Sequence, residues 1–227
     1  MGMEDRAGET RGLLDEGTGT LSEILDTGTP DLSALLVADE DWVDAPREGQ
    51  RPYPSGLPYL TQSIDPPTLV MPGTLSEVFE PRTLATWPLV VWHELAHAFL
   101  LQRPVPRTPV WMREFVPQAL AAAVARRNGV LSQHLEAVAT PSDLTIRDFG
   151  GPADAKQQMA FQNALLGLGS AALEEFGEDF PGRLVHALWN QTEIVGEARA
   201  EQLLADALGP DSRSWLEGRT ELQGGQT

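Results

Sequence analysis

The sequence predicts an α+β fold in which a small antiparallel or mixed sheet near the N-terminus packs on a mainly helical C-terminal half. Two short segments, LPYLTQS (57–63) and PTLVMPG (67–73), have the β-branched and aromatic content of strands and are bounded by proline. Strands of this kind belong at the edge of a sheet. After Pro81 the chain changes to long segments typical of helices, so the strands precede a helical domain.

Residues 1–50 differ in composition from the rest of the chain. They carry 13 acidic residues against three arginines and few large apolar side chains. We therefore expect an acidic, loosely structured segment here, followed by one domain over residues 51–222 and a frayed tail at 223–227. An acidic arm of this kind either solvates the protein or lies in the cleft of the domain as a latency arm that blocks it.

The predicted helices follow in order. The segment 84–102, LATWPLVVWHELAHAFLLQ, is apolar on most of its circumference, so we expect a buried central helix that ends before Pro104. A second helix should begin near Thr108 and end at Gly129, with Pro117 producing a kink or marking a later start.

Three more helices are predicted over residues 157–177, 180–191 and 196–209, and glycines 177 and 209 end two of them. Gly167 and Gly169 lie inside the first of these helices. Each costs about 1 kcal/mol relative to alanine, so we expect another helix to approach closely there.

Composition excludes several classes of function. At 227 residues, with 41% apolar and 22% charged residues, the chain resembles a globular domain. The net charge of −17 repels phosphate backbones and anionic lipids, so neither nucleic acid nor membrane is an expected partner. The acidic start lacks the features of a signal peptide, and no apolar run is long enough to span a bilayer, so we predict a cytoplasmic protein.

The string His93-Glu94-Leu95-Ala96-His97 carries the chemistry. In a helix, residues four apart lie on one face, so both imidazoles can bind one metal ion while Glu94 faces its open side. The chain has no cysteine, so a zinc ion would be held by nitrogen and oxygen alone. The ion lowers the pKa of its water to about 7, and Glu94 serves as the catalytic base that takes the proton. Two buried core histidines are the alternative reading, but their desolvation without a metal would cost several kcal/mol.

Glu114 is the candidate third ligand. It begins the next predicted helix, among Trp, Phe and Val, where an unpaired carboxylate would be costly. An ordinary surface acid paired with Arg113 or Arg107 is the other possibility. Two histidines and one glutamate make a thermolysin-like zinc centre.

A resemblance to the gluzincin metallopeptidases is carried by VVWHELAHAFL and the Trp-x-x-Glu helix that follows it. The predicted helices after Glu114 are also similar to those of minimal domains of this family. The resemblance covers roughly residues 68–220. It implies a zinc peptidase acting on a peptide or protein substrate, with His93, His97 and Glu114 as metal ligands and Glu94 as base. It also implies a strand above the metal, expected at 67–73, that pairs with extended substrate backbone.

The chain departs from the family pattern at two positions. Phe115 stands where relatives commonly have glycine, and Phe161 stands where they often have a tyrosine that donates to the oxyanion. The remaining candidates for that donor are Tyr59, His134 and His186. Gln118 occupies the position of an acid that orients a zinc histidine, where it either accepts the imidazole N–H or is solvated.

Two functions outside the peptidase class stay open. One is a regulatory or interaction protein, catalytically weak or silent, that keeps zinc for its structure, as Phe115 and Phe161 would allow. The other is an amidohydrolase that uses the same centre on substrates other than peptides.

Overall fold

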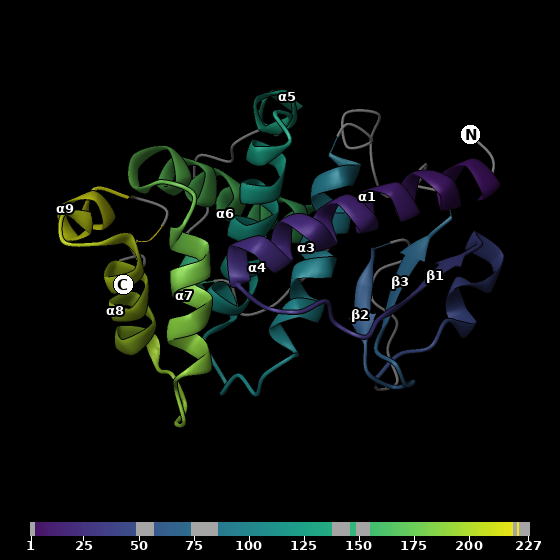
Figure 1. Ribbon diagram of the computed structural model, residues 1–227, viewed down its shortest axis with the longest axis horizontal. Coiled ribbons are helices and arrows are strands. Elements are labelled where there is room, and N and C mark those ends of the chain that lie inside the picture. The colour runs from purple at the N-terminus through teal and green to yellow at the C-terminus, as the bar shows by residue number, and fades with distance from the viewer. Residues whose placement is uncertain are drawn as a thin grey trace.

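The computed structural model describes residues 3–48, 57–73, 86–137, 146–148, 155–219 and 222. A three-stranded sheet lies at one end of the molecule and the C-terminal helices lie at the other, with the long first helix running between them (Figure 1). The α+β prediction is therefore confirmed, including the position of the central helix between sheet and helices.

The sheet has the strand order β1-β3-β2. Strands β2 (Tyr59–Thr61) and β3 (Thr68–Pro72) are antiparallel and confirm the two predicted strands. Strand β1 (Ser33–Val37), which was not predicted, pairs in parallel with β3. The expectation that both predicted strands are edge strands is wrong for β3, because β1 covers its other edge and all five of its residues are buried.

The expectation of a loosely structured N-terminal segment is also wrong for the residues described. Helix α1 (Met3–Leu25) is followed by β1 and the short 3-10 helix η1 (Asp39–Asp44). The side chains of Leu21 and Leu25 in α1 are completely buried. Helix α1 packs with few large apolar side chains because a glycine lets its backbone lie close to the neighbouring helix.

Gly17 gives that close approach of α1 to the central helix. A Cβ atom placed on Gly17 would lie 2.5 Å from Cδ1 of Trp92, which is too close for any real Cβ. The indole N–H of Trp92 donates to the carbonyl of Leu13 at 2.9 Å. Helix α1 therefore packs directly against α3, the helix that carries the two motif histidines.

The central pair of helices is α3 (Trp87–Leu100) and α4 (Val110–Arg127), as predicted. Most residues of both are buried, since α1 and the sheet cover α3 while α6 and α7 cover α4. Helix α4 begins well before Pro117 and continues through it, so the later start is excluded.

The C-terminal part contains α5 (Leu131–Ala137), η2 (Ile146–Asp148), α6 (Ala155–Phe176), α7 (Phe180–Trp189), α8 (Glu197–Leu208) and α9 (Ser212–Glu217). Helices α6, α7 and α8 confirm the three predictions, and Gly177 and Gly209 follow α6 and α8 with φ of 83° and 114°. Gly169 contacts Ala119 of α4 as expected, but a Cβ on Gly167 would meet nothing within 4 Å, so that prediction is wrong. The predicted tail at 223–227 lies outside the described residues.

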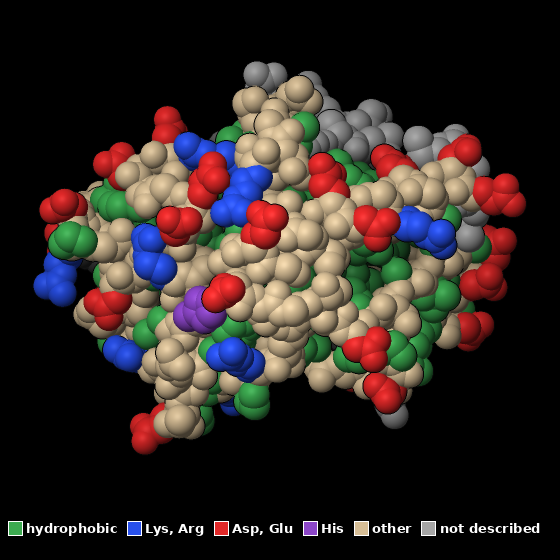
Figure 2. All heavy atoms as spheres, in the orientation of Figure 1, with side chains coloured by type: hydrophobic (Ala, Val, Ile, Leu, Met, Phe, Trp, Pro, Cys, Tyr) green, Lys and Arg blue, Asp and Glu red, His purple; other side chains and the backbone are tan. Residues whose placement is uncertain are grey.

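Acidic side chains are scattered over the face shown in Figure 2, and several lie at the end where η1 and the start of α1 lie. In the part of the chain that the structure describes, no helix combines the length and apolarity needed to cross a membrane.

Candidate metal centre

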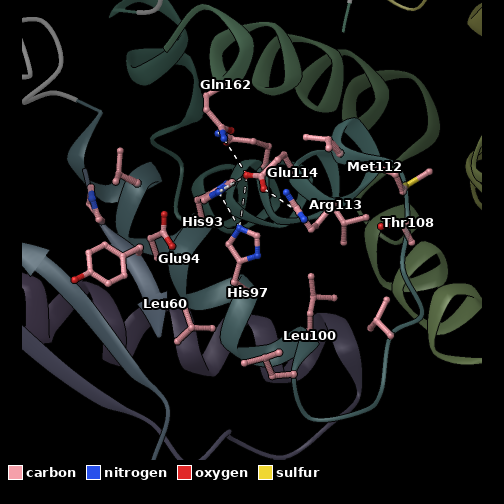
Figure 3. Close-up of a pocket in the computed structure, with 18 of the residues that line it drawn as sticks. Leu60, His93, Glu94, His97, Leu100, Thr108, Met112, Arg113, Glu114 and Gln162 are labelled. Atoms are coloured by element: carbon pink, nitrogen blue, oxygen red, sulfur yellow. Dashed lines mark hydrogen bonds and ion pairs between the residues drawn. The ribbon is translucent and has the colours of Figure 1, made fainter. Parts of the chain in front are cut away.

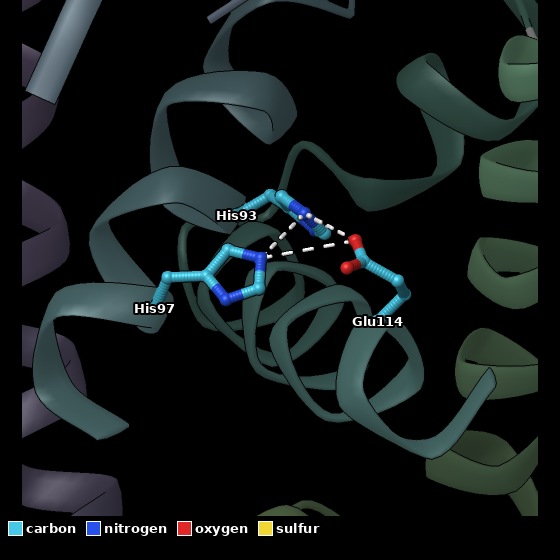
Figure 4. A group of neighbouring side chains, drawn as sticks. All are labelled: His93, His97 and Glu114. Carbon is cyan, nitrogen blue, oxygen red and sulfur yellow. Dashed lines mark hydrogen bonds and ion pairs between the residues drawn. The ribbon is translucent and has the colours of Figure 1, made fainter. Parts of the chain in front are cut away.

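Three side chains converge between α3 and α4, as Figure 4 shows: His93, His97 and Glu114. The two Nε2 atoms are 3.2 Å apart. Oε2 of Glu114 lies 3.6 Å from Nε2 of His93 and 3.8 Å from Nε2 of His97. The structure thus brings together the three residues that the sequence predicted as ligands.

The local sequence explains this convergence. His93 and His97 are four residues apart in α3 and therefore lie one above the other on the same helix face. The short connection between α3 and α4 returns the chain so that Glu114, in the first turns of α4, faces them.

The spacing and chemistry of these donors fit a zinc ion. Zn–N and Zn–O bonds of about 2.0–2.2 Å in a tetrahedron place the donor atoms about 3.3–3.6 Å apart, close to the distances found between the three donors. Two imidazole nitrogens and a carboxylate oxygen form a common catalytic zinc set with three protein ligands. The same donors also suit other divalent metals that prefer imidazole ligands.

The two histidines differ in their protonation. Burial lowers the pKa of His93 and outweighs the opposing influence of Glu114, so this imidazole is neutral and ready to bind a metal. Burial acts the same way on His97, but the contact with Glu114 and the charge of Glu94 outweigh it and raise the pKa of His97. A metal ion that takes the place of this proton would release it on binding.

The pKa values of the two glutamates are shifted in opposite directions. Burial raises the pKa of Glu94 to about 8, only partly offset by the charge of His97. Burial also opposes the charge on Glu114, but its contacts with His93 and His97 prevail and lower its pKa well below the ordinary range. Glu114 is thus a permanent anion suited to bind a cation, whereas Glu94 can gain and lose a proton near neutral pH.

A chain of amides holds Glu114 in place. The Nε2 amide of Gln162 in α6 donates to Oε2 of Glu114 at 3.0 Å, and the Nε2 amide of Gln118 donates to Oε1 of Gln162 at 2.7 Å. Arg113 Nε lies 3.5 Å from the other carboxylate oxygen. Gln118 therefore supports Glu114 through Gln162, and the expectation that it accepts a histidine N–H is wrong.

Gln162 was missed by the sequence analysis. The available signal is a pair of glutamines, Gln158 and Gln162, four residues apart on the same face of this helix. Both line the same cavity as the ligands.

A cavity of about 960 Å³ opens onto the site. Figure 3 shows Leu60 of β2 on one side, Thr108 and Met112 on the other, and His97 between them. Glu94 also lines this cavity, on the side of β2. None of the described residues before Leu57 lines it, so the acidic segment as far as residue 48 is not a latency arm on the metal site.

The strand that the resemblance placed above the metal needs correction. Both edges of β3 are hydrogen-bonded to neighbouring strands, so this strand has no edge for a substrate. Strand β2 is the edge strand on the cavity side, and the residues from Leu57 to Leu60 line the cavity.

Of the candidates for an oxyanion donor, Tyr59 lines the cavity, but its hydroxyl group is already engaged. The hydroxyl of Tyr59 donates to the carbonyl of Pro46 at 2.9 Å. His186 in α7 contacts the ring of Trp189 and does not line the cavity. The side chain of His134 lies outside the described residues.

The two departures from the family pattern are core residues. Phe161 is completely buried and does not line the cavity. Phe115 stacks on Phe180 with ring centroids 6.4 Å apart and so joins α4 to α7. Neither phenylalanine obstructs the metal ligands.

Comparison with known proteins adds no relative: no family model, no curated protein and no solved structure matches this chain. What can be said of its function rests on the site itself.

Proposed function

We propose that this protein is a zinc-dependent metallohydrolase that cleaves peptide bonds, with His93, His97 and Glu114 as metal ligands and Glu94 as general base. The observation that supports this most strongly is that Glu94 lines the same large cavity as the three ligands. A metal kept only for structure would have its coordination completed by protein and would need neither a base nor room for a substrate.

The bound zinc would supply Lewis-acid chemistry, lowering the pKa of a water molecule and polarising the substrate carbonyl. Glu94 would accept the proton of that water and later return it to the leaving amine. Gln162, which is held by Gln118, keeps the carboxylate of Glu114 in one orientation. The edge strand β2 offers backbone groups to an extended peptide along the cavity wall.

Metal analysis and a base variant test this proposal together. The purified protein should bind about one zinc per chain, and His93→Ala or His97→Ala should abolish that binding. Glu94→Gln should keep the zinc and lose peptide hydrolysis by several orders of magnitude. The exposed Glu174 of α6 provides the control, because Glu174→Gln should change neither property.

Two outcomes contradict the proposal in different ways. If the protein takes up no zinc, the assignment of His93, His97 and Glu114 as a zinc site is wrong. Zinc binding in a protein whose hydrolysis of peptide pools is absent, or is unaffected by Glu94→Gln, would favour a regulatory or interaction protein with a structural metal.

A further inference from the structure

Three arginines line the far side of the metal cavity. Arg103 and Arg107 lie in the connection between α3 and α4, and Arg113 lies at the start of α4. Residues 101–113 contain no acidic residue, in a chain whose net charge is −17. Among the residues that the structure describes, Glu94 and Glu114 are the only acidic side chains that line the cavity.

These acids do not neutralise the arginines of the connection. Glu114 is engaged by both histidines and by Gln162, with only Arg113 beside it. Glu94 lies on the opposite, β2 side of the cavity (Figure 3). Among the described residues, no carboxylate lies within ion-pair distance of Arg103 or Arg107.

Some arginines elsewhere in the protein have acidic partners. Arg126, Arg127 and Arg147 each form an ion pair with a glutamate. Acidic residues outnumber basic ones about twofold over the chain, yet three arginines lie within residues 103–113 with no acidic residue among them. They produce a local positive field in an otherwise negative protein.

The connection that carries the arginines is fixed from behind by the C-terminal helices. The backbone N–H of Val195 donates to the carbonyl of Arg107 at 3.0 Å. The guanidinium of Arg103 lies over the ring of Trp189, 4.9 Å from its centroid, which orients the group without using its charge on a carboxylate.

The start of α4 is held in the same way, because the indole N–H of Trp111 donates to Oε2 of Glu197 in α8 at 2.6 Å. A positioned but unpaired guanidinium is the usual protein group for binding a carboxylate through two parallel hydrogen bonds.

We propose that Arg103 and Arg107 form a carboxylate-binding subsite and that the preferred substrate is an acidic peptide, whose carboxylate they hold while its backbone crosses the metal site. This inference deepens the proposed peptidase function and rests on it. The carboxylate comes either from an Asp or Glu side chain or from the C-terminus of the peptide. Both sources present the same planar anion to the arginines.

Binding of labelled peptides to the Glu94→Gln protein tests the subsite without requiring turnover. The probes are fluorescein-labelled eight-residue peptide pools that differ only in Glu or Gln at two fixed positions, each prepared with a free and an amidated C-terminus. The Glu pools should bind at least about tenfold more tightly than the Gln pools if a side chain is recognised. The free-acid pools should bind more tightly than the amidated pools if the C-terminus is recognised.

Arginine variants then assign the preference to these residues. Arg107→Gln and Arg103→Gln should each remove most of the preference for the carboxylate while leaving zinc content unchanged. The matched control is Arg213→Gln, in exposed α9 away from the cavity, which should leave the preference intact.

Three outcomes separate the subsite from the peptidase proposal. Equal binding of carboxylate and amide pools by a zinc-loaded, hydrolytically active protein overturns the subsite and leaves the peptidase intact. A preference that survives in the Arg103→Gln, Arg107→Gln double variant overturns it as well. Selective binding of carboxylate pools by a protein that takes up no zinc supports the subsite and contradicts the peptidase.

Discussion

The buried carboxyl of Glu94 should destabilise the metal-free protein at neutral pH. Its pKa is raised from an ordinary value of 4.5 to about 8, chiefly by burial. Below pH 4.5 the group is protonated in both the folded and the unfolded chain and has no effect. As the pH rises from 4.5 to 8, only the unfolded chain loses the proton, so stability falls with pH across this window.

The magnitude follows from the width of the window. Each pH unit between 4.5 and 8 is worth about 1.4 kcal/mol, which gives an upper limit of about 5 kcal/mol. Because Glu94 is partly open to the cavity, water reduces this effect. We expect Glu94→Gln, which cannot ionise, to raise the free energy of unfolding at pH 8 by roughly 2–3 kcal/mol.

The assay is urea unfolding of the chelator-treated parent and of Glu94→Gln from pH 4 to 9. The two free energies of unfolding should coincide near pH 4 and diverge up to pH 8, while the titrations of groups that Glu94 does not influence cancel in the difference. The exposed control Glu174→Gln should stay within about 0.5 kcal/mol of the parent at every pH. A Glu94→Gln protein that is equally stable at pH 8, or less stable, would refute the reasoning.

Three further predictions concern the candidate ligand Glu114, the amide of Gln162 that supports it, and the packing of α1 against α3. Glu114→Gln should weaken zinc affinity more than about 100-fold in a competition titration while leaving the fold near native, and an unchanged affinity would exclude Glu114 as the third ligand. Gln162→Leu should weaken zinc affinity by about tenfold, since Glu114 loses the amide that orients it, and no change would show that the amide chain is not needed. Gly17→Ala should lower the free energy of unfolding by about 1–3 kcal/mol because its Cβ collides with Trp92. Gly12→Ala, with nothing within 4 Å, should raise it by about 0.5–1 kcal/mol, and similar shifts in thermal denaturation for both glycine variants would contradict the close packing of α1.

The ligand set was predictable because all of it is local. The helical period fixes the common face of His93 and His97, and the connection to Glu114 is too short to carry it far away. Gln162 was not predictable in this way, because its contact with Glu114 depends on how α6 packs against α4. The same holds for Arg103 and Arg107, whose position depends on Trp189 and Val195 behind them.

The N-terminal segment shows why composition misled the prediction. Sparse apolar residues and several glycines are typical of loosely structured chains, and residues 1–50 have both. In α1, however, Gly17 permits a close approach to the large indole of Trp92. This contact depends on where Trp92 packs in the fold, so it cannot be predicted from the sequence of residues 1–50 alone.

All three candidate metal ligands lie within residues 93–114, on two consecutive helices. Closing so short a loop costs an unfolded chain little entropy, so its histidines and Glu114 can meet a zinc ion before the fold forms. Zinc that also binds the unfolded chain stabilises the native state by less than its native affinity alone would give. The melting temperature should therefore rise less steeply with zinc concentration than the dissociation constant predicts, and zinc present during refolding should organise the α3–α4 hairpin first.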